Sequence, residues 1–157
     1  MIKLLIPLLG ACSSGHPNPT TCSHAEVTAV FAEFGVREER WKIDRGSYLA
    51  TGLTEEQTFP ASPSRNAIQV RSFPASWRQL DVQLPQQVLG CSYVAIARSS
   101  GAPGPRAAAL FDFKVPAADW YYLLARCDDG SEVDNYYFAS SVDHIIRTSP
   151  DTARTCL

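Results

Sequence analysis

Apolar side chains recur at helical spacing near the start of the chain, with polar side chains between them. This spacing places them on one face of an amphipathic helix. The apolar positions are Val27, Val30, Phe31, Phe34 and Trp41. Ser23 and Glu26 fit a capping box, in which each side chain satisfies a backbone donor at a helix start, and Gly46 suits a helix end. The pattern predicts a helix of about 22 residues with one buried face.

Charged residues on the same stretch are spaced for ion pairs across one helical turn. Glu33 precedes Arg37 by four residues, and Glu38 precedes Lys42 by the same interval. Acid before base is the favourable order for such pairs, so both support the helix. Gly35, in the middle of this helix, costs about 1 kcal/mol relative to alanine and is the weakest point of the expected helix.

Four later runs of aromatic and β-branched residues predict strands. They are residues 88–98, 107–115, 120–127 and 134–141. Turn-forming segments separate the runs, and the Asp-Gly pair at 129–130 is a strong hairpin signal. The long stretch 47–85 is rich in Thr, Ser, Pro and Gln and reads as a connection with one or two short elements.

An apolar sheet face must be buried against another layer, so we expect the helix to cover one face of the sheet. The predicted fold class is α+β, a long N-terminal amphipathic helix packed on a four-stranded antiparallel meander. Trp120, Tyr121 and Tyr122 could form a stacking surface for a ligand. Successive residues of a strand point to opposite faces, so core packing is the favoured use of these aromatics.

The first residues read as a bacterial lipoprotein signal. Lys3 precedes a short apolar run, and residues 9–12, Leu-Gly-Ala-Cys, match a lipobox that ends on the acceptor Cys12. Small residues let a peptidase reach the extended backbone, and only a thiol can form the thioether to diacylglycerol. The expected parts are a signal peptide at 1–11, the lipidated Cys12 with a polar tether at 12–22, and a globular domain at 23–157. The alternative is a buried first strand with a free cysteine.

Charge and hydropathy restrict the partners. The net charge is −2 and no basic cluster occurs, which gives no support to a nucleic-acid partner because phosphates require grouped cations. No later run has the roughly 18 apolar residues of a spanning helix, so we expect membrane attachment through the lipid alone. The expected location is the bacterial cell envelope, on the periplasmic or outer surface.

Lipidation of Cys12 would leave an even set of four cysteines. They are Cys22, Cys91, Cys127 and Cys156. None shows the close spacing of a zinc knuckle or a redox Cys-x-x-Cys motif, so we expect two disulfides in an oxidising compartment, with three connectivities open.

The expected meander favours one of these connectivities. With a strand at 107–115, the strands that carry Cys91 and Cys127 are the first and third, and they run the same way. The two cysteines then lie at opposite ends of the sheet, farther apart than the roughly 7 Å that a disulfide allows between Cα atoms. We therefore expect Cys22 to pair with Cys127 and Cys91 with Cys156.

Several segments resemble type IV pilin-like proteins in order and spacing. They are 25–48, which ends on Gly-Ser-Tyr, then 73–80, 91–95 and 120–130. The resemblance covers most of residues 23–147 and implies the pilin head, a long helix, a variable connection and a four-stranded meander. A prepilin peptidase site and an apolar helix half do not precede this helix, and a lipobox and tether stand there instead. Both ends together suggest a pilin-like lipoprotein.

The third hairpin carries candidate calcium ligands. They are Asp128, Asp129, Glu132 and Asp134. Related pilin-like sequences resemble Asp-x-Asp-Gly-Asp-Gly here, and carboxylate oxygens at alternating positions suit Ca²⁺. The alternative is a solvated turn without metal. No other cofactor is expected.

No catalytic residue is predicted. His16, His24 and His144 are far apart, and no Ser or Cys stands in a nucleophile context beside them. The leading hypothesis is a non-enzymatic pilin-like envelope lipoprotein that acts through protein–protein contacts in adhesion, secretion or a pilus, with no small-molecule substrate identified. The alternatives are a minor pilin or pseudopilin with a truncated start, and a small periplasmic enzyme or ligand-binding domain.

Overall fold

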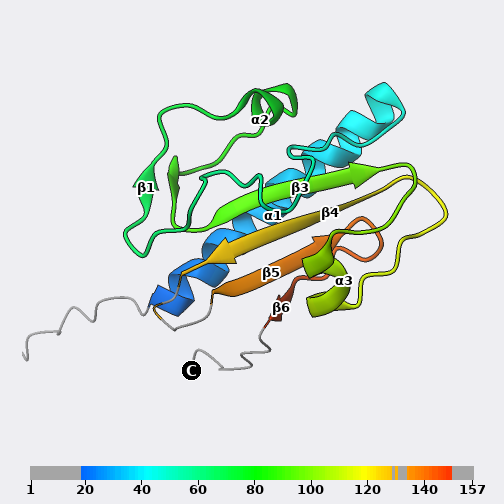
Figure 1. The fold of residues 1–157 in the computed structure, drawn as a ribbon. Helices are drawn as coiled ribbons and strands as arrows, with labels where there is room; N and C mark the ends of the chain where they lie inside the picture. The colour runs from blue at the N-terminus through cyan, green and yellow to red at the C-terminus, as the bar shows by residue number, and fades with distance from the viewer. Residues whose placement is uncertain (1–18, 129, 131–133, 150–157) are drawn as a thin grey trace, which may run out of the picture.

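The computed structural model describes residues 19–128, 130 and 134–149, with side chains from His24 onward. Figure 1 shows the elements in their spatial arrangement. They are α1 (Pro19–Arg45), β1 (Ile68–Gln69), α2 (Ala75–Gln79), β2 (Val88–Leu89), β3 (Ser92–Arg98), α3 (Pro105–Phe111), β4 (Trp120–Cys127), β5 (Asn135–Ser140) and β6 (Arg147–Ser149).

The centre of the fold is a four-stranded sheet with the order β3-β4-β5-β6, each strand antiparallel to the next. In Figure 1, α1 lies behind this sheet and α3 lies in front of it. The predicted α+β class, a helix packed on a four-stranded antiparallel meander, is confirmed. A separate pair, β1 with β2, belongs to the connection that follows α1.

The predicted apolar face of α1 packs on the sheet and forms the core between the two layers. Val27, Phe31 and Phe34 are all buried, in one cluster with sheet residues. The Phe34 ring meets the fully buried Trp77 ring edge-on at 4.8 Å between centroids. Trp77 comes from α2, so this short helix anchors the connection to the same core. Burial of these aromatic rings is a main stabilising contribution of the α1 layer.

Strand β4 shows why the sheet has two buried faces. Tyr121 and Leu123 face α1, whereas Trp120, Tyr122 and Leu124 belong to the cluster beneath α3. All five are buried, which follows from the two-residue period of a strand with a helix on each side. Core packing of the three consecutive aromatics is therefore confirmed.

The strand predicted at 107–115 is wrong, because α3 occupies most of it. Pro105 is at the first helical turn, where its missing N–H costs nothing, and the alanines that follow are strong helix formers. Asp112, with φ of 47°, ends the helix in the left-handed conformation. The aromatic Phe111 and Phe113 suggested a strand, but they pack on the sheet from a helix and its exit.

The other strands differ from prediction in smaller ways. The run 88–98 divides into β2 and β3, because β2 pairs with β1 outside the main sheet. Strand β4 has the predicted bounds, and β5 lies within the predicted run 134–141. The fourth strand of the sheet is β6, a three-residue segment that was not predicted. Its residues are too few to show a periodic pattern.

The ends of α1 depart from the capping-box prediction. The helix begins at Pro19, inside the predicted tether, and Glu26 contacts a strand instead of capping the helix start. The helix continues through Gly35 and ends before Gly46, whose φ is 82° and whose N–H donates to the carbonyl of Lys42. The predicted terminator is thereby confirmed, as a glycine accepts this left-handed conformation.

Candidate functional site

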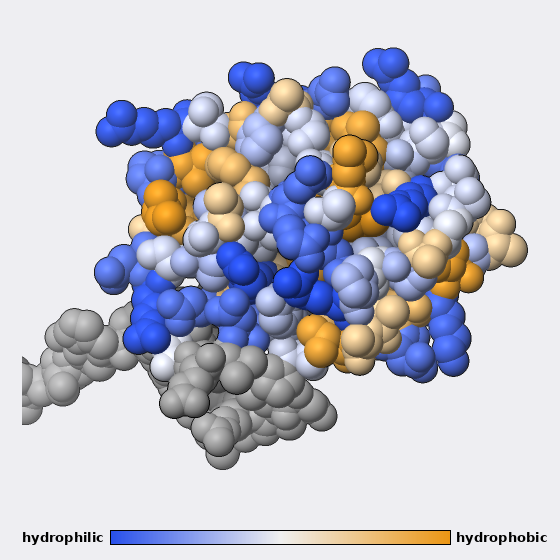
Figure 2. Space-filling view, in the orientation of Figure 1, coloured by the Kyte–Doolittle hydropathy of each residue, from blue (hydrophilic) through white to orange (hydrophobic). Residues whose placement is uncertain are grey.

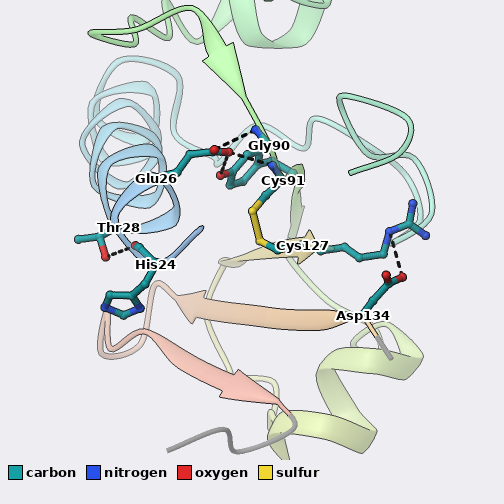
Figure 3. Close-up of a disulfide and its surroundings, with 9 residues drawn as sticks. His24, Glu26, Thr28, Gly90, Cys91, Cys127 and Asp134 are labelled. Carbon is teal, nitrogen blue, oxygen red and sulfur yellow. Dashed lines mark hydrogen bonds and ion pairs between the residues drawn. A yellow bond between two sulfur atoms is a disulfide. The ribbon is translucent and has the colours of Figure 1, made fainter. Parts of the chain in front are cut away.

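A disulfide joins Cys91 to Cys127 at one end of the sheet, with their Cα atoms 4.4 Å apart (Figure 3). The predicted pairs, Cys22 with Cys127 and Cys91 with Cys156, are therefore wrong. The error follows from the strand predicted at 107–115. Because α3 occupies that segment, β3, which follows Cys91, and β4, which ends on Cys127, are neighbours and antiparallel.

The register shows how the two cysteines meet. Ser92 pairs with Arg126, so Cys91, before β3, lies beside Cys127, the last residue of β4. Both cysteines are 1% exposed and belong to the core beneath α1. A buried disulfide fits an oxidising, extracytoplasmic compartment. Cys12 and Cys156 lie outside the described residues, and Cys22 lies in α1 where side chains are not described.

Glu26 holds the chain next to this disulfide (Figure 3). Its carboxylate accepts hydrogen bonds from the backbone N–H of Gly90 at 2.8 Å and of Cys91 at 3.0 Å. The hydroxyl of Tyr93 donates to the same carboxylate at 2.6 Å. Burial and the carboxylate raise the pKa of Tyr93, which keeps this hydroxyl a donor. Three donors fix the entry of β3 against α1.

Two more glutamates of α1 bind backbone in the same way. The Glu33 carboxylate accepts from the Arg37 guanidinium at 2.8 Å, as predicted, and also from the backbone N–H of Gln83 at 2.8 Å. The Glu38 carboxyl accepts from the backbone N–H of Leu49 at 2.9 Å. Together with Glu26, these side chains join α1 to later segments of the chain at three points along the helix. Backbone N–H groups of these segments are thereby satisfied.

The predicted pair of Glu38 with Lys42 is wrong. Lys42 contacts Asp119 and lies over the ring of Tyr48, while Glu38 is fully buried. One oxygen of Glu38, Oε1, has no hydrogen-bond partner among the described residues. Burial raises the pKa of the Glu38 carboxyl to about 8, with the Leu49 N–H opposing this effect and Glu39 adding to it. The side chain is therefore mainly neutral in the folded protein at neutral pH.

The folded state should consequently lose stability as pH rises. Glu38 binds its proton more tightly in the folded than in the unfolded chain, so its contribution is complete below pH 4.5 and is lost up to about pH 8. Between pH 6 and 8 the free energy of unfolding should fall by about 2 kcal/mol. Glu38→Gln, which imitates the neutral carboxyl, should remove this slope. Urea denaturation at several pH values measures it.

Asp44→Asn is the matched control, since Asp44 is an exposed carboxylate of the same helix. This variant should keep the pH dependence of the wild-type protein. An equal slope in wild-type protein and Glu38→Gln would show that Glu38 does not titrate in this range.

The predicted calcium ligands are only partly described. Asp128 accepts from the Arg65 guanidinium at 3.0 Å and from the Gly130 N–H at 2.9 Å. The Asp134 carboxylate lies 3.7 Å from the Arg126 guanidinium (Figure 3). Asp129 and Glu132 lie outside the described residues. Within the described part of the chain, no group of three or more His, Cys, Asp or Glu side chains is placed to hold a metal.

Glu55, which the sequence did not single out, is a second buried carboxylate with a positioning role. It is 3% exposed and accepts hydrogen bonds from the backbone N–H groups of Arg106 and Ala107 at 2.8 and 2.9 Å. The hydroxyl of Tyr122 donates to it at 3.0 Å. These are the first N–H groups of α3, which no side chain of α3 itself caps. A carboxylate some 50 residues earlier in the chain thus caps the start of α3. The sequence around α3 gives no sign of this cap, because the capping residue is not a neighbour in sequence.

An apolar groove of about 660 Å³ lies between α1 and residues of β4, β5 and the segment that follows β5. Its floor includes Leu123 and Ala139, and Val36 and Ile43 line the side formed by α1. His144 lines the opposite side, and its Nδ1 is 3.4 Å from the Tyr121 hydroxyl.

The face toward the viewer in Figure 1 has a different character. In Figure 2, hydrophobic side chains on this face form several separate patches among hydrophilic ones.

The three candidate histidines are not brought together within the described residues. His16 lies outside those residues, His24 lies on α1, and His144 lies after β5. The His24 ring contacts the Tyr137 ring, and the His144 ring contacts the Tyr121 ring.

Among the described residues, no helix combines the length and the apolar character that crossing a membrane requires. No protein-family model, curated protein or solved structure matches this chain.

Proposed function

We propose that this chain is a non-enzymatic, pilin-like lipoprotein of the bacterial cell envelope that acts through contacts with other proteins. The observation that carries the proposal is the disulfide between Cys91 and Cys127 in a helix-on-meander domain that follows a lipobox. The loosely pilin-like arrangement of α1 and the sheet supports it. The carboxyl groups of Glu26, Glu38 and Glu55 support it further, because each accepts hydrogen bonds from the backbone as a structural element.

Replacing Cys12 by alanine tests the membrane anchor. In the native host the wild-type chain should sediment with membranes, because several acyl chains bind far more firmly than one. Cys12→Ala should move the protein to the fraction that does not sediment. Fractionation followed by immunoblotting measures the distribution, and mass spectrometry of the wild-type N-terminus identifies the modification.

Cys22→Ala is the matched control and should leave the protein with the membranes. A wild-type chain that keeps an unmodified Met1 in its native host would contradict the proposal.

The groove beside α1 supports one alternative, a ligand-binding role. An apolar floor with a hydroxyl and an imidazole at one side has the general character of a small-molecule site. A fatty acid or another apolar ligand that raises the melting temperature of wild-type protein, but not of Ala139→Trp, would favour this alternative.

A further inference from the structure

The outer face of α1 has little charge between His24 and Val36. Its exposed apolar positions are Ala25, Ala29, Ala32, Val36 and Ile43. Between His24 and Val36, no exposed residue of this helix carries a full charge, although the solvent face of a surface helix usually carries several. The reason lies in the carboxylates described above, since Glu26, Glu33 and Glu38 turn toward the connection.

Two large side chains on this face project into solvent. Val36 is 65% exposed and Ile43 is 82% exposed. Ala29, Val36 and Ile43 are spaced seven residues apart, the interval at which side chains align along a packed helix pair. Exposed apolar residues that align in this way mark an interaction surface more often than isolated ones do.

A positive and a negative side chain lie beside this face, so two copies of α1 can pair them across a two-fold axis. Arg40 is exposed and makes no ion pair or hydrogen bond within the part of the chain that the structure describes. Glu33 lies seven residues earlier, on the same flank of the helix, and both of its hydrogen bonds go to Oε1. A second α1 that runs antiparallel, with a two-fold axis near Val36, places Arg40 beside the second copy's Glu33.

The same two-fold axis also matches the apolar side chains. Val36 meets its own copy, and Ile43 meets the second copy's Ala29, where a small side chain leaves room for a large one. Each contact occurs twice, as an interface between identical chains requires. We propose that the outer face of α1 is a homodimer interface in which two copies pack α1 against α1, antiparallel, with their sheets on the outside.

Sedimentation velocity on the full chain carrying Cys12→Ala tests this interface without the lipid. The protein should show a concentration-dependent dimer that a non-reducing gel shows to be free of intermolecular disulfides. Val36→Glu and Ile43→Glu should each weaken the dimer at least about tenfold, because each buries an unpaired carboxylate. Leu53→Glu is the matched control, since Leu53 is 75% exposed on the connection, and it should leave the dimer unchanged.

Charge exchange tests the antiparallel register. Arg40→Glu and Glu33→Arg should each weaken the homodimer, because each places like charges opposite one another. An equimolar mixture of the two variants should form a heterodimer in which both pairs are restored. Recovery on mixing also shows that both variants are folded.

A chain that stays monomeric at every concentration overturns the proposal, and an apolar ligand or another protein would then be the occupant of this face. A dimer that Val36→Glu and Ile43→Glu affect no more than Leu53→Glu overturns it as well. The proposed dimer does not require lipidation, so either proposal can fail while the other stands.

Discussion

Replacing both Cys91 and Cys127 by alanine should lower the free energy of unfolding by about 4 kcal/mol. The disulfide joins residues 36 positions apart, and a loop of this size restricts the unfolded chain considerably. Both side chains are 1% exposed in the core, so their loss also removes buried contacts. Urea denaturation of wild-type and variant protein, both kept oxidised, measures the difference.

Cys22→Ala combined with Cys156→Ala is the control for this prediction. If the disulfide stabilises the domain as described, removal of these other cysteines should cost much less. Peptide mapping without reduction should yield a peptide that links Cys91 to Cys127. A link from Cys22 to Cys127 would instead contradict the neighbouring, antiparallel positions of β3 and β4.

Phe31→Ala should destabilise the domain by about 3 to 5 kcal/mol. Phe31 is 5% exposed between α1 and the sheet, where its ring meets the ring of Tyr93 edge-on at 6.3 Å between centroids. Truncation removes this contact and leaves a cavity that the surrounding aromatic rings cannot fill without moving. Thermal and urea denaturation measure the loss.

Val36→Ala serves as the comparison on the same helix, because Val36 is 65% exposed. With the protein dilute enough to be monomeric, its effect should stay within about 0.5 kcal/mol. A loss below about 1 kcal/mol for Phe31→Ala would mean that the inner face of α1 does not form the core.

One incorrect strand explains most of the differences between prediction and structure. Residues 107–115 include Phe111 and Phe113, which favour a strand, but Pro105 and the alanines after it form α3. A strand in this segment would separate the strands next to Cys91 and Cys127, whereas β3 and β4 are direct neighbours. The disulfide prediction was therefore wrong because of the strand order. Two cysteines at opposite ends of parallel strands would indeed be too far apart to bond.

The charged residues of α1 show a different kind of limit. The interval between Glu33 and Arg37 allows a local pair, and the structure contains it. The same interval joins Glu38 to Lys42, yet Glu38 is buried and binds the N–H of Leu49. Local spacing cannot show which side of the helix the connection will cover. The contacts of Glu26 and Glu55, more than 50 residues away in sequence, are beyond local patterns for the same reason.

The sequence by itself determined the presence of the helix and its end before Gly46, the bounds of β4 and the inward positions of Phe31 and Phe34, because side-chain periodicity is a local property. Only the tertiary structure decided that α3 covers the second face of the sheet, that Cys91 meets Cys127, and that three glutamates of α1 bind backbone N–H groups of later segments. Each of these depends on which segments become neighbours, and that choice is made by the packing of the whole domain.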